Sequence, residues 1–285
     1  MCTQSDRRRR GLFRYRDSSL QSWPTIAASA LVIILLVVTL SGSGFTDAKQ
    51  TPDYCRAGLC PVGTQHIACN GSNRFGKSCS RPMLVKMTPK YVNLLLNYHN
   101  SKRNRLACGA MRRFASASSM QKLRWNDELA HLAEYNAKSC NFEHDECHNT
   151  FRFPYTGQSI GMKWFHGMNL TTTQVVRDLM RKWYLEHKLT KQRDLDQFEV
   201  NQQSLAIGHF TQMIHADTTE IGCALVRFYK HHNNLRFLHY YLVCNYSEGN
   251  IENRPVYRKG KRCSRCKNGC TRGKYRCLCR DWNTL

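Results

Sequence analysis

Cysteine constrains this chain more than any other residue, because 15 of its 285 residues are cysteines. Cys2 precedes an uncharged apolar run, and the other fourteen follow that run, between Cys55 and Cys279. An even number of cysteines in an oxidising compartment is typical of a disulfide framework, whereas cytosolic thiols stay reduced. The hydrophobic fraction of 41% is that of a globular protein. We therefore expect an extracellular fold with its own core and many disulfides.

The apolar run, residues 25–40, is typical of a targeting segment, because it carries no charge and six arginines precede it. As a helix it would extend only about 24 Å, against about 30 Å for the hydrocarbon core of a bilayer. Small residues after the run offer cleavage sites, which favours a removed signal peptide and a secreted protein. The long basic leader keeps open the alternative of a type II membrane-anchored protein. In both cases the chain beyond about Phe45 faces the outside.

The formal net charge of +23 is concentrated towards the end of the chain, where residues 254–280 hold eleven Lys or Arg and no Asp or Glu. Such a basic tail predicts an anionic extracellular partner, either a sulfated glycan or acidic lipid headgroups. The alternative is a solvated surface that serves only solubility. An extracellular location argues against nucleic acid as a partner.

Changes in composition divide the chain into four expected segments. They are a basic leader with a signal peptide or signal anchor at 1–48, a disulfide-stapled extension at 49–86, a main domain at 87–253 and a Cys-rich basic tail at 254–285. The extension places four cysteines among Gly and Pro and has few aliphatic residues, so it is not expected to fold alone.

Three helices are predicted in the main domain from the spacing of apolar residues. The first spans about residues 89–105, the second follows the N-cap Asn126 up to Cys140, and the third begins near Thr173.

The third predicted helix carries an apolar stripe with Leu179, Met180 and Trp183, which we expect to lie in the core. Glu186 follows Leu179 by one heptad, so its carboxylate is expected at the edge of the buried face. A carboxylate in that place needs a partner.

A β-hairpin is predicted from two stretches rich in Val, Leu, Phe and Tyr, residues 221–229 and 235–246. The turn is expected within residues 231–234, and Cys223 and Cys244 fall one on each strand.

Several stretches are similar to the signatures of the CAP superfamily, which includes the antigen 5 and cysteine-rich secretory proteins. GHFTQMIHADT at 208–218 and HYYLVCNYSEGN at 239–250 resemble the general signatures. DYCRAGLCPVGTQHIAC at 53–69, HNSKRN at 99–104 and FEHDECHNT at 142–150 resemble the insect venom-allergen, or antigen-5, branch. The resemblance implies an α+β fold, an α-β-α sandwich in which a small, mainly antiparallel sheet lies between helices.

The resemblance also implies four disulfides, Cys55–Cys69, Cys60–Cys147, Cys79–Cys140 and Cys223–Cys244. Six extracellular cysteines then remain, Cys108 and five in the tail. Six cysteines allow fifteen pairings, and the sequence does not choose among them.

Members of the superfamily share a cleft lined by two histidines and two acidic residues, which in several members holds a divalent metal. By resemblance these positions are His144, Gln158, Glu186 and His209. Gln158 stands where the general pattern often has Glu, so a metal would be held by fewer negative charges. His215 stands where the signature normally has Trp, which makes the surroundings more polar.

Two interpretations of these residues stay open. His144 and His209, with Glu186, would bind zinc, since two imidazoles and a carboxylate with one open position is what a catalytic zinc uses. The alternative is a hydrogen-bonded polar cluster that requires no cofactor.

Other motifs in the sequence are not interpreted as catalytic or metal-binding sites. HDECH at 144–148 has nearly the spacing of the HExxH metalloprotease motif, but Asp145 replaces the required Glu and Cys147 is implied in a disulfide. Cys263 and Cys266 are expected in disulfides rather than in a zinc knuckle. A serine hydrolase triad is not expected.

Two sequons, at Asn70 and Asn169, are predicted glycosylation sites, whereas the sequon at Asn245 falls in a predicted strand and is expected to stay unmodified.

The preferred hypothesis is a secreted, non-enzymatic, antigen-5-like protein that binds a lipid, a protein or an anionic glycan through its cleft and surface loops. One alternative is a zinc-dependent extracellular hydrolase that uses His144, Glu186 and His209. Another is an inhibitor of a channel or protease that acts through the Cys-rich tail.

Overall fold

The computed structural model describes residues 52–280, which form one compact unit. The predicted leader at 1–48, including Cys2, lies outside the described residues. Between residues 52 and 280, no helix is long and apolar enough to cross a membrane. The choice between a signal peptide and an anchor therefore stays a prediction.

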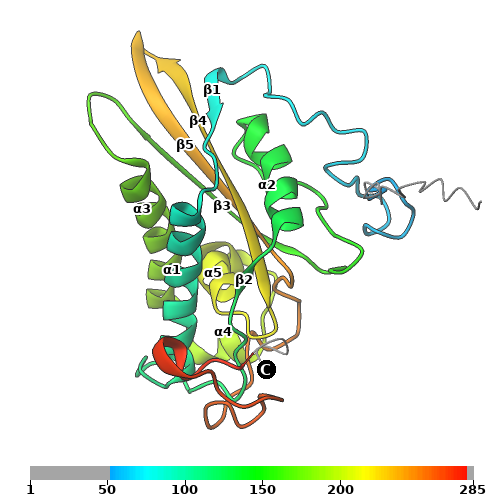
Figure 1. Ribbon diagram of the computed structural model, residues 1–285, viewed down its shortest axis with the longest axis vertical. Coiled ribbons are helices and arrows are strands. Elements are labelled where there is room, and N and C mark those ends of the chain that lie inside the picture. The colour runs from blue at the N-terminus through cyan, green and yellow to red at the C-terminus, as the bar shows by residue number, and fades with distance from the viewer. Residues whose placement is uncertain (1–51, 281–285) are drawn as a thin grey trace, which may run out of the picture. The chain divides into compact units, whose positions relative to one another are not determined.

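A five-stranded sheet forms the middle of the fold (Figure 1). Its strands are β1 (Ser80–Leu84), β2 (Arg124–Trp125), β3 (Gly157–Phe165), β4 (Glu220–His232) and β5 (Leu235–Tyr246). The main path runs β1-β4-β5-β3 with antiparallel neighbours, and the short β2 pairs in parallel with β4. Strand β3 is therefore an outer strand, and one of its edges is not paired with another strand of the sheet.

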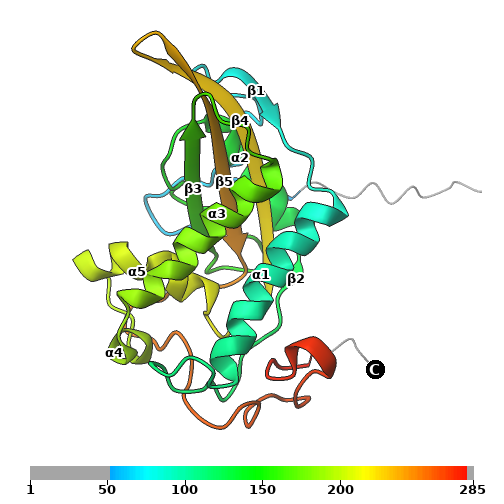
Figure 2. The same cartoon turned by 90° about the vertical axis from the view of Figure 1, so that its left-hand side faces the viewer.

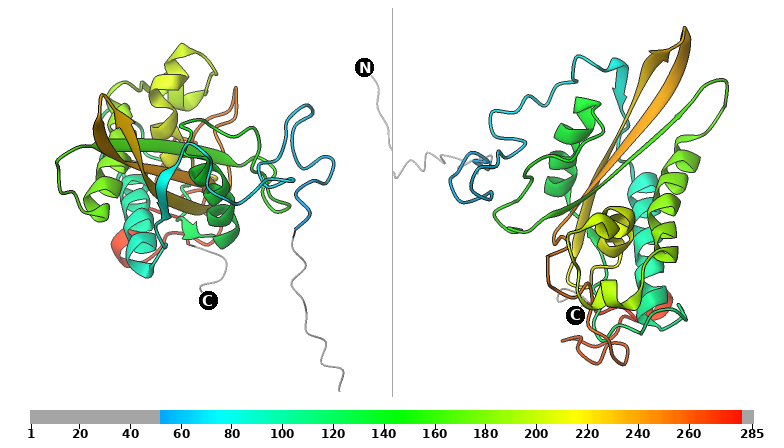
Figure 3. Two further views of the ribbon diagram at one scale, coloured as in Figure 1. Left: turned by 90° about the horizontal axis from the view of Figure 1, so that it is seen from above. Right: turned by 180° about the vertical axis from the view of Figure 1, so that it is seen from behind.

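Helices cover both faces of the sheet (Figures 2 and 3). They are α1 (Pro89–Ala107), α2 (Asp127–Ser139), α3 (Thr172–Leu185), α4 (Gln192–Asp196) and α5 (Gln202–Met213), with the short 3-10 helices η1 (Glu186–Lys188) and η2 (Gly273–Tyr275).

Neighbouring strand residues point to opposite faces of the sheet, and each face has its own core. Val226 and Val243 pack with residues of α2, whereas Leu225 and Leu242 belong to the larger core with α1, α3 and α5. The predicted sandwich, with a mainly antiparallel sheet between helices, is confirmed.

Local sequence signals set where the helices begin. The side-chain oxygen of Asn126 accepts the N–H of Leu129 at 2.8 Å, so the predicted N-cap of α2 is formed. Thr171 and Gln174 form a capping box at the start of α3, which therefore begins one residue before the predicted position.

Strands β4 and β5 form the predicted hairpin, but its turn is tighter than expected. Asn233 and Asn234 have φ angles of 47° and 62°, both in the left-handed region. Two such residues are typical of the type I′ turn, whose twist matches that of the flanking strands. His231 and His232, expected in the turn, therefore belong to β4.

Seven disulfides join the described cysteines. Four are the pairs that the resemblance implies, Cys55–Cys69, Cys60–Cys147, Cys79–Cys140 and Cys223–Cys244. The other three pair the six cysteines that the sequence left open, as Cys108–Cys277, Cys263–Cys270 and Cys266–Cys279.

The Cys-rich tail packs against the main domain. The N–H of Val256 donates to the backbone oxygen of Leu195 at 2.9 Å, and its own oxygen accepts the N–H of Ala216 at 2.8 Å. Leu278 is fully buried in the larger core. The extension at 49–86 likewise contributes β1 to the sheet. Both segments, expected as additions to the main domain, are therefore packed as parts of the same fold.

Candidate functional site

The first half of the candidate site is a hydrogen-bonded pair, His209 on α5 and Glu186 just after α3. Nδ1 of His209 lies 2.6 Å from Oε1 of Glu186, and Nε2 of His209 lies 3.1 Å from the backbone oxygen of Ile160 on β3. The second oxygen of Glu186 accepts the backbone N–H of Phe210 at 3.0 Å. Both ring nitrogens of His209 thus face hydrogen-bond acceptors. The carboxylate of Glu186 has the partner that its position required.

Trp183 supports this pair from the core. Its ring stacks on that of His209, with centroids 5.5 Å apart and planes inclined by 6°. Its Nε1–H donates to the backbone oxygen of Ile160 at 3.2 Å. Trp183 is buried together with Leu179 and Met180, as predicted for this stripe.

The second half of the candidate site is another hydrogen-bonded pair, His144 and Gln158. His144 lies exposed in the loop after α2, and its Nδ1 is 2.8 Å from Oε1 of Gln158 on β3. Because Oε1 is an acceptor, Nδ1 donates to it, and in the neutral imidazole Nε2 keeps its lone pair. The amide of Gln158 donates to Oδ2 of Asp145 at 2.6 Å and to Oδ1 of Asn245 at 3.0 Å.

Asp145 is the centre of the hydrogen bonds behind His144. Its side chain is 6% exposed and lies 2.5 Å from Nδ1 of His148, whose Nε2 lies 3.1 Å from the backbone oxygen of Gly157. Asn136 also donates to Asp145, at 3.0 Å. Burial raises the pKa of Asp145, but hydrogen bonds and the charge of His148 outweigh it and lower the pKa to about 2. Asp145 is therefore a buried anion at neutral pH.

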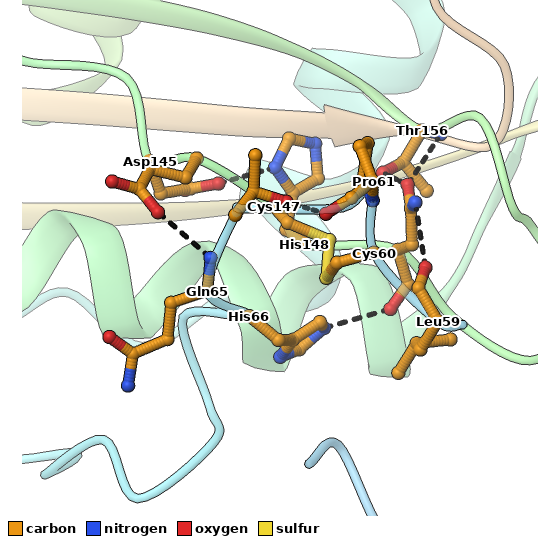
Figure 4. The surroundings of a disulfide bond; sticks show 12 residues. Leu59, Cys60, Pro61, Gln65, His66, Asp145, Cys147, His148 and Thr156 are labelled. Carbon is orange, nitrogen blue, oxygen red and sulfur yellow. Dashed lines mark hydrogen bonds and ion pairs between the residues drawn. A yellow bond between two sulfur atoms is a disulfide. The ribbon is translucent and has the colours of Figure 1, made fainter. Parts of the chain in front are cut away.

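The N-terminal extension holds this loop in place (Figure 4). Cys60 is bonded to Cys147, and the N–H of Gln65 donates to the carboxylate of Glu146 at 2.8 Å. Nε2 of His66 lies 2.8 Å from a backbone oxygen of the same loop, and burial lowers the pKa of His66. A neutral His66 donates through Nε2, so the extension contributes a covalent bond and hydrogen bonds to the position of His144.

The two pairs meet at strand β3. Gln158 offers its side chain from this strand, and Ile160, two residues further on, offers its backbone oxygen. We call His144, Gln158, Glu186 and His209 the edge site, because β3 is an outer strand of the sheet. The four residues named by resemblance thus form two separate pairs, one joined to β3 through the side chain of Gln158 and the other through the backbone oxygen of Ile160.

A zinc ion would need nitrogens of His144 and His209 and an oxygen of Glu186. Nε2 of His144 makes no hydrogen bond with a described residue, but both nitrogens of His209 and both oxygens of Glu186 are engaged. Within residues 52–280, no group of three or more His, Cys, Asp or Glu is placed to hold a metal ion. The residues as arranged do not fit zinc, so His144 and His209 as metal ligands remain a prediction without support from this geometry.

The sequence contains one G-x-S-x-G stretch, GQSIG at 157–161, which sequence reasoning overlooked. In a serine hydrolase this pattern forms a sharp turn between a strand and a helix. Here strand β3 runs straight through it, and Ser159 is fully buried. The stretch is therefore part of the sheet and not a nucleophile elbow.

The other polar residues singled out in the sequence differ in accessibility. His215 is 4% exposed, and burial lowers its pKa to about 4, so it is a neutral residue inside the fold. Asn70 and Asn169 are exposed, which leaves their predicted glycosylation open to test, whereas Asn245 is fully buried.

The comparisons with a family model and with known proteins agree with each other. The model of the cysteine-rich secretory protein family, CAP, matches residues 96–246. Venom allergen-1 of Aedes aegypti is 37% identical over 255 residues, which cover 89% of this chain and 95% of that protein. Venom allergen 5 of Dolichovespula arenaria is 32% identical over 216 residues, which cover 73% of this chain and 99% of that protein.

Solved structures share the fold. The match with the crystal structure of NaASP2 with Zn2+ covers 68% of this chain and 97% of the NaASP2 chain, with a TM-score of 0.53 and 26% sequence identity. The match with the structure of BmVAL-1 covers 69% of this chain and 96% of the BmVAL-1 chain, with a TM-score of 0.54 and 23% sequence identity.

Proposed function

The chain belongs to the cysteine-rich secretory protein family, CAP, and from this membership we propose that it is a secreted binding protein and not an enzyme. Its curated relatives carry the names of venom allergens, which supports an extracellular location. Seven disulfides among the described residues support the same compartment, because cytosolic thiols stay reduced.

One observation argues against catalysis by the pair of Glu186 and His209. A general base needs a free lone pair, and a metal ligand needs one too. In the edge site both nitrogens of His209 face acceptors, and both oxygens of Glu186 accept hydrogen bonds. A hydrolytic role would first break two of these bonds, so the pair is better suited to hold α5 against β3.

His144 is the member of the edge site that offers a contact to a ligand. It is exposed, and its Nε2 makes no hydrogen bond with any residue between 52 and 280. An acceptor nitrogen on a fixed loop suits a ligand that donates a hydrogen bond, such as a hydroxyl of a lipid or glycan or an amide of a protein. These three ligand classes are those expected from the sequence.

The test compares the secreted full chain with His144→Ala on lipid and glycan arrays. We expect His144→Ala to lose about fivefold or more in binding, the cost of one hydrogen bond of about 1 kcal/mol. His131→Ala is the matched control, because His131 is an exposed histidine on α2 outside the edge site, and it should bind as the unaltered chain does.

Mass spectrometry of the same protein tests the enzyme alternative. We expect a chain recovered from culture medium without the leader and without stoichiometric zinc. One zinc per chain, whose removal abolishes cleavage of a peptide or ester library, would establish the hydrolase instead. Retention of Cys2 in a membrane-bound protein would contradict secretion.

A further inference from the structure

A basic groove lies beside the C-terminal end of α1. It consists of two adjoining pockets of about 280 and 550 Å³, both lined by Arg105 and Ala110. The cationic side chains that line it come from α1, from the loop after α1 and from the Cys-rich tail. They are Arg105, Arg112, Arg113, Lys274 and Arg276.

The positive charge of the basic groove is not balanced by the protein. Neither pocket is lined by an Asp or Glu. Within the described part of the chain, the side chains of Arg105, Arg112 and Arg276 make no ion pair and no hydrogen bond. Lys102 lies next to them over the ring of Tyr184, and burial and the charge of Arg105 lower its pKa. Crowded cations without counter-ions favour an anion from outside.

The segments that carry these cations are fixed relative to one another. Cys108 at the end of α1 is bonded to Cys277, 169 residues further along the chain. The hydroxyl of Tyr275 donates to Oδ1 of Asn97 at 2.6 Å, and Arg113 donates to the backbone oxygen of Lys188 at 2.9 Å. Figure 2 shows η2 beside the end of α1. A rigid array of cations binds a polyanion with a smaller loss of conformational entropy than flexible side chains on a free tail.

The apolar surface argues against a membrane at this place. A surface that inserts into a bilayer combines cations with exposed large apolar side chains. Within residues 52–280, the large apolar side chains that are exposed lie outside the basic groove. Examples are Trp164 and Met168 near the end of β3 and Leu205 on α5. None of them lines the basic groove.

We propose that the basic groove binds a sulfated polysaccharide, with Arg105, Arg112 and Arg276 contacting its sulfate groups. Guanidinium groups form strong charge-assisted hydrogen bonds with such oxyanions. Two adjoining pockets suit consecutive sulfated sugars of a chain. None of the residues that line the groove belongs to the edge site, so this proposal does not depend on the proposed function.

The experiment measures binding of the full secreted chain to immobilised heparin by surface plasmon resonance at several NaCl concentrations. The groove variant is Arg105→Gln, Arg112→Gln and Arg276→Gln. The control variant is Arg74→Gln, Lys77→Gln and Lys86→Gln, three exposed cations in the segment around β1 whose side chains make no hydrogen bond with any residue from 52 to 280. Both variants remove three charges.

We expect the groove variant to bind heparin about tenfold or more weakly and to depend less steeply on salt, because three charge contacts are lost. The control variant should change less than about twofold. Fully desulfated heparin should not bind.

A second readout works on the unaltered protein. Heparin should protect Arg105, Arg112 and Arg276, but not Arg74, from modification by phenylglyoxal. Equal losses in both variants, or no protection, would show that only overall charge matters and would overturn the proposal. Groove-dependent binding to phosphatidylserine vesicles without binding to heparin would assign the surface to lipid headgroups instead.

Discussion

Asp145 explains why Gln158 suits this chain at a position where the family pattern often has Glu. The amide of Gln158 donates to Asp145, a buried carboxylate that also receives hydrogen bonds from Asn136 and His148. A Glu at position 158 would bring a second negative charge to the same place, which costs free energy in a buried site. The substitution is therefore matched to its surroundings, and the two residues act as a unit.

The first prediction at the residue scale concerns the stability that Asp145 contributes. The pKa of Asp145 is about 2 in the folded protein, below the usual value of about 3.9 in an unfolded chain. The ionised carboxylate thus stabilises the fold above about pH 4, by about 2 to 3 kcal/mol, and this is lost as the pH falls from about 4 to about 2. Asp145→Asn should lose that free energy of unfolding at pH 6 and show a flatter pH dependence below pH 4.

Urea unfolding at pH 6, 4, 3 and 2 measures this effect. Glu252→Gln is the control, because Glu252 is exposed and makes no hydrogen bond with another described residue. Parallel curves for Asp145→Asn and the unaltered chain would show that the carboxylate does not contribute as expected.

At the scale of elements, α1 is fixed by polar residues that point into the fold. His99 donates through Nδ1 to the oxygen of Leu95 and accepts from the hydroxyl of Tyr246, and burial lowers its pKa to about 4. Asn100 exchanges hydrogen bonds with the backbone of Leu123. The buried His99 and Asn100 of the HNSKRN stretch thus give α1 its position.

Arg103 is the most heavily bonded of these residues. Its guanidinium is fully buried, and its partners are backbone oxygens of Gln121, Met213, His215, Ala216 and Thr218. Most of these oxygens belong to the segment after α5, which carries part of the GHFTQMIHADT signature. Arg103 therefore joins α1 to the helix that holds His209.

The second prediction is that Arg103→Lys destabilises the chain by about 3 kcal/mol or more, because an ammonium cannot serve as many fixed acceptors and leaves buried oxygens unpaired. Arg105→Lys is the matched control, two residues further along α1 but exposed, and should change stability by less than about 0.5 kcal/mol. Thermal unfolding compares the two. Equal melting temperatures would contradict the role given to Arg103.

The helices and strands that were predicted from the sequence are those with strong local signals. Helix α2 has a cap at Asn126 and a regular apolar face, and the β4–β5 hairpin has long apolar runs around an Asn-Asn turn. Strand β3 was missed because its residues do not alternate regularly between buried and exposed. Helix α5 was missed because it buries the polar residues Thr211 and Gln212, which tertiary hydrogen bonds satisfy.

The residues of the edge site were found by resemblance, but their pairing was not. Ile160 contributes a backbone oxygen, which no side-chain pattern reports. Asp145 entered the sequence analysis only as a departure from HExxH, and its burial depends on contacts with α2 and β3 that form in the fold. Long-range hydrogen bonds of this kind are outside what local spacing predicts.

At the scale of the whole molecule, the disulfides differ in how much chain they close. Cys223 and Cys244 lie directly opposite each other on β4 and β5 and close 21 residues, whereas Cys108 and Cys277 close 169. A larger closed loop removes more conformational freedom from the unfolded chain.

The third prediction follows from this difference. Removing Cys108–Cys277 by Ser substitutions at both positions should cost about 5 kcal/mol, against about 3 kcal/mol for Cys223–Cys244 on chain entropy alone. Chemical unfolding of the two double variants, with the remaining disulfides confirmed by peptide mapping, provides the comparison. A larger loss for Cys223–Cys244 would show that packing at the sheet outweighs loop closure.

The Cys108–Cys277 bond also dictates an order of events during biosynthesis. Helix α1 is synthesised early, but Cys277, the partner of Cys108 at its end, is synthesised 169 residues later. Four of the five strands of the sheet, β2 to β5, are synthesised in that interval. The helix can therefore be locked in place only after the sheet beside it exists, and a premature bond from Cys108 to any earlier thiol would have to be undone by an isomerase.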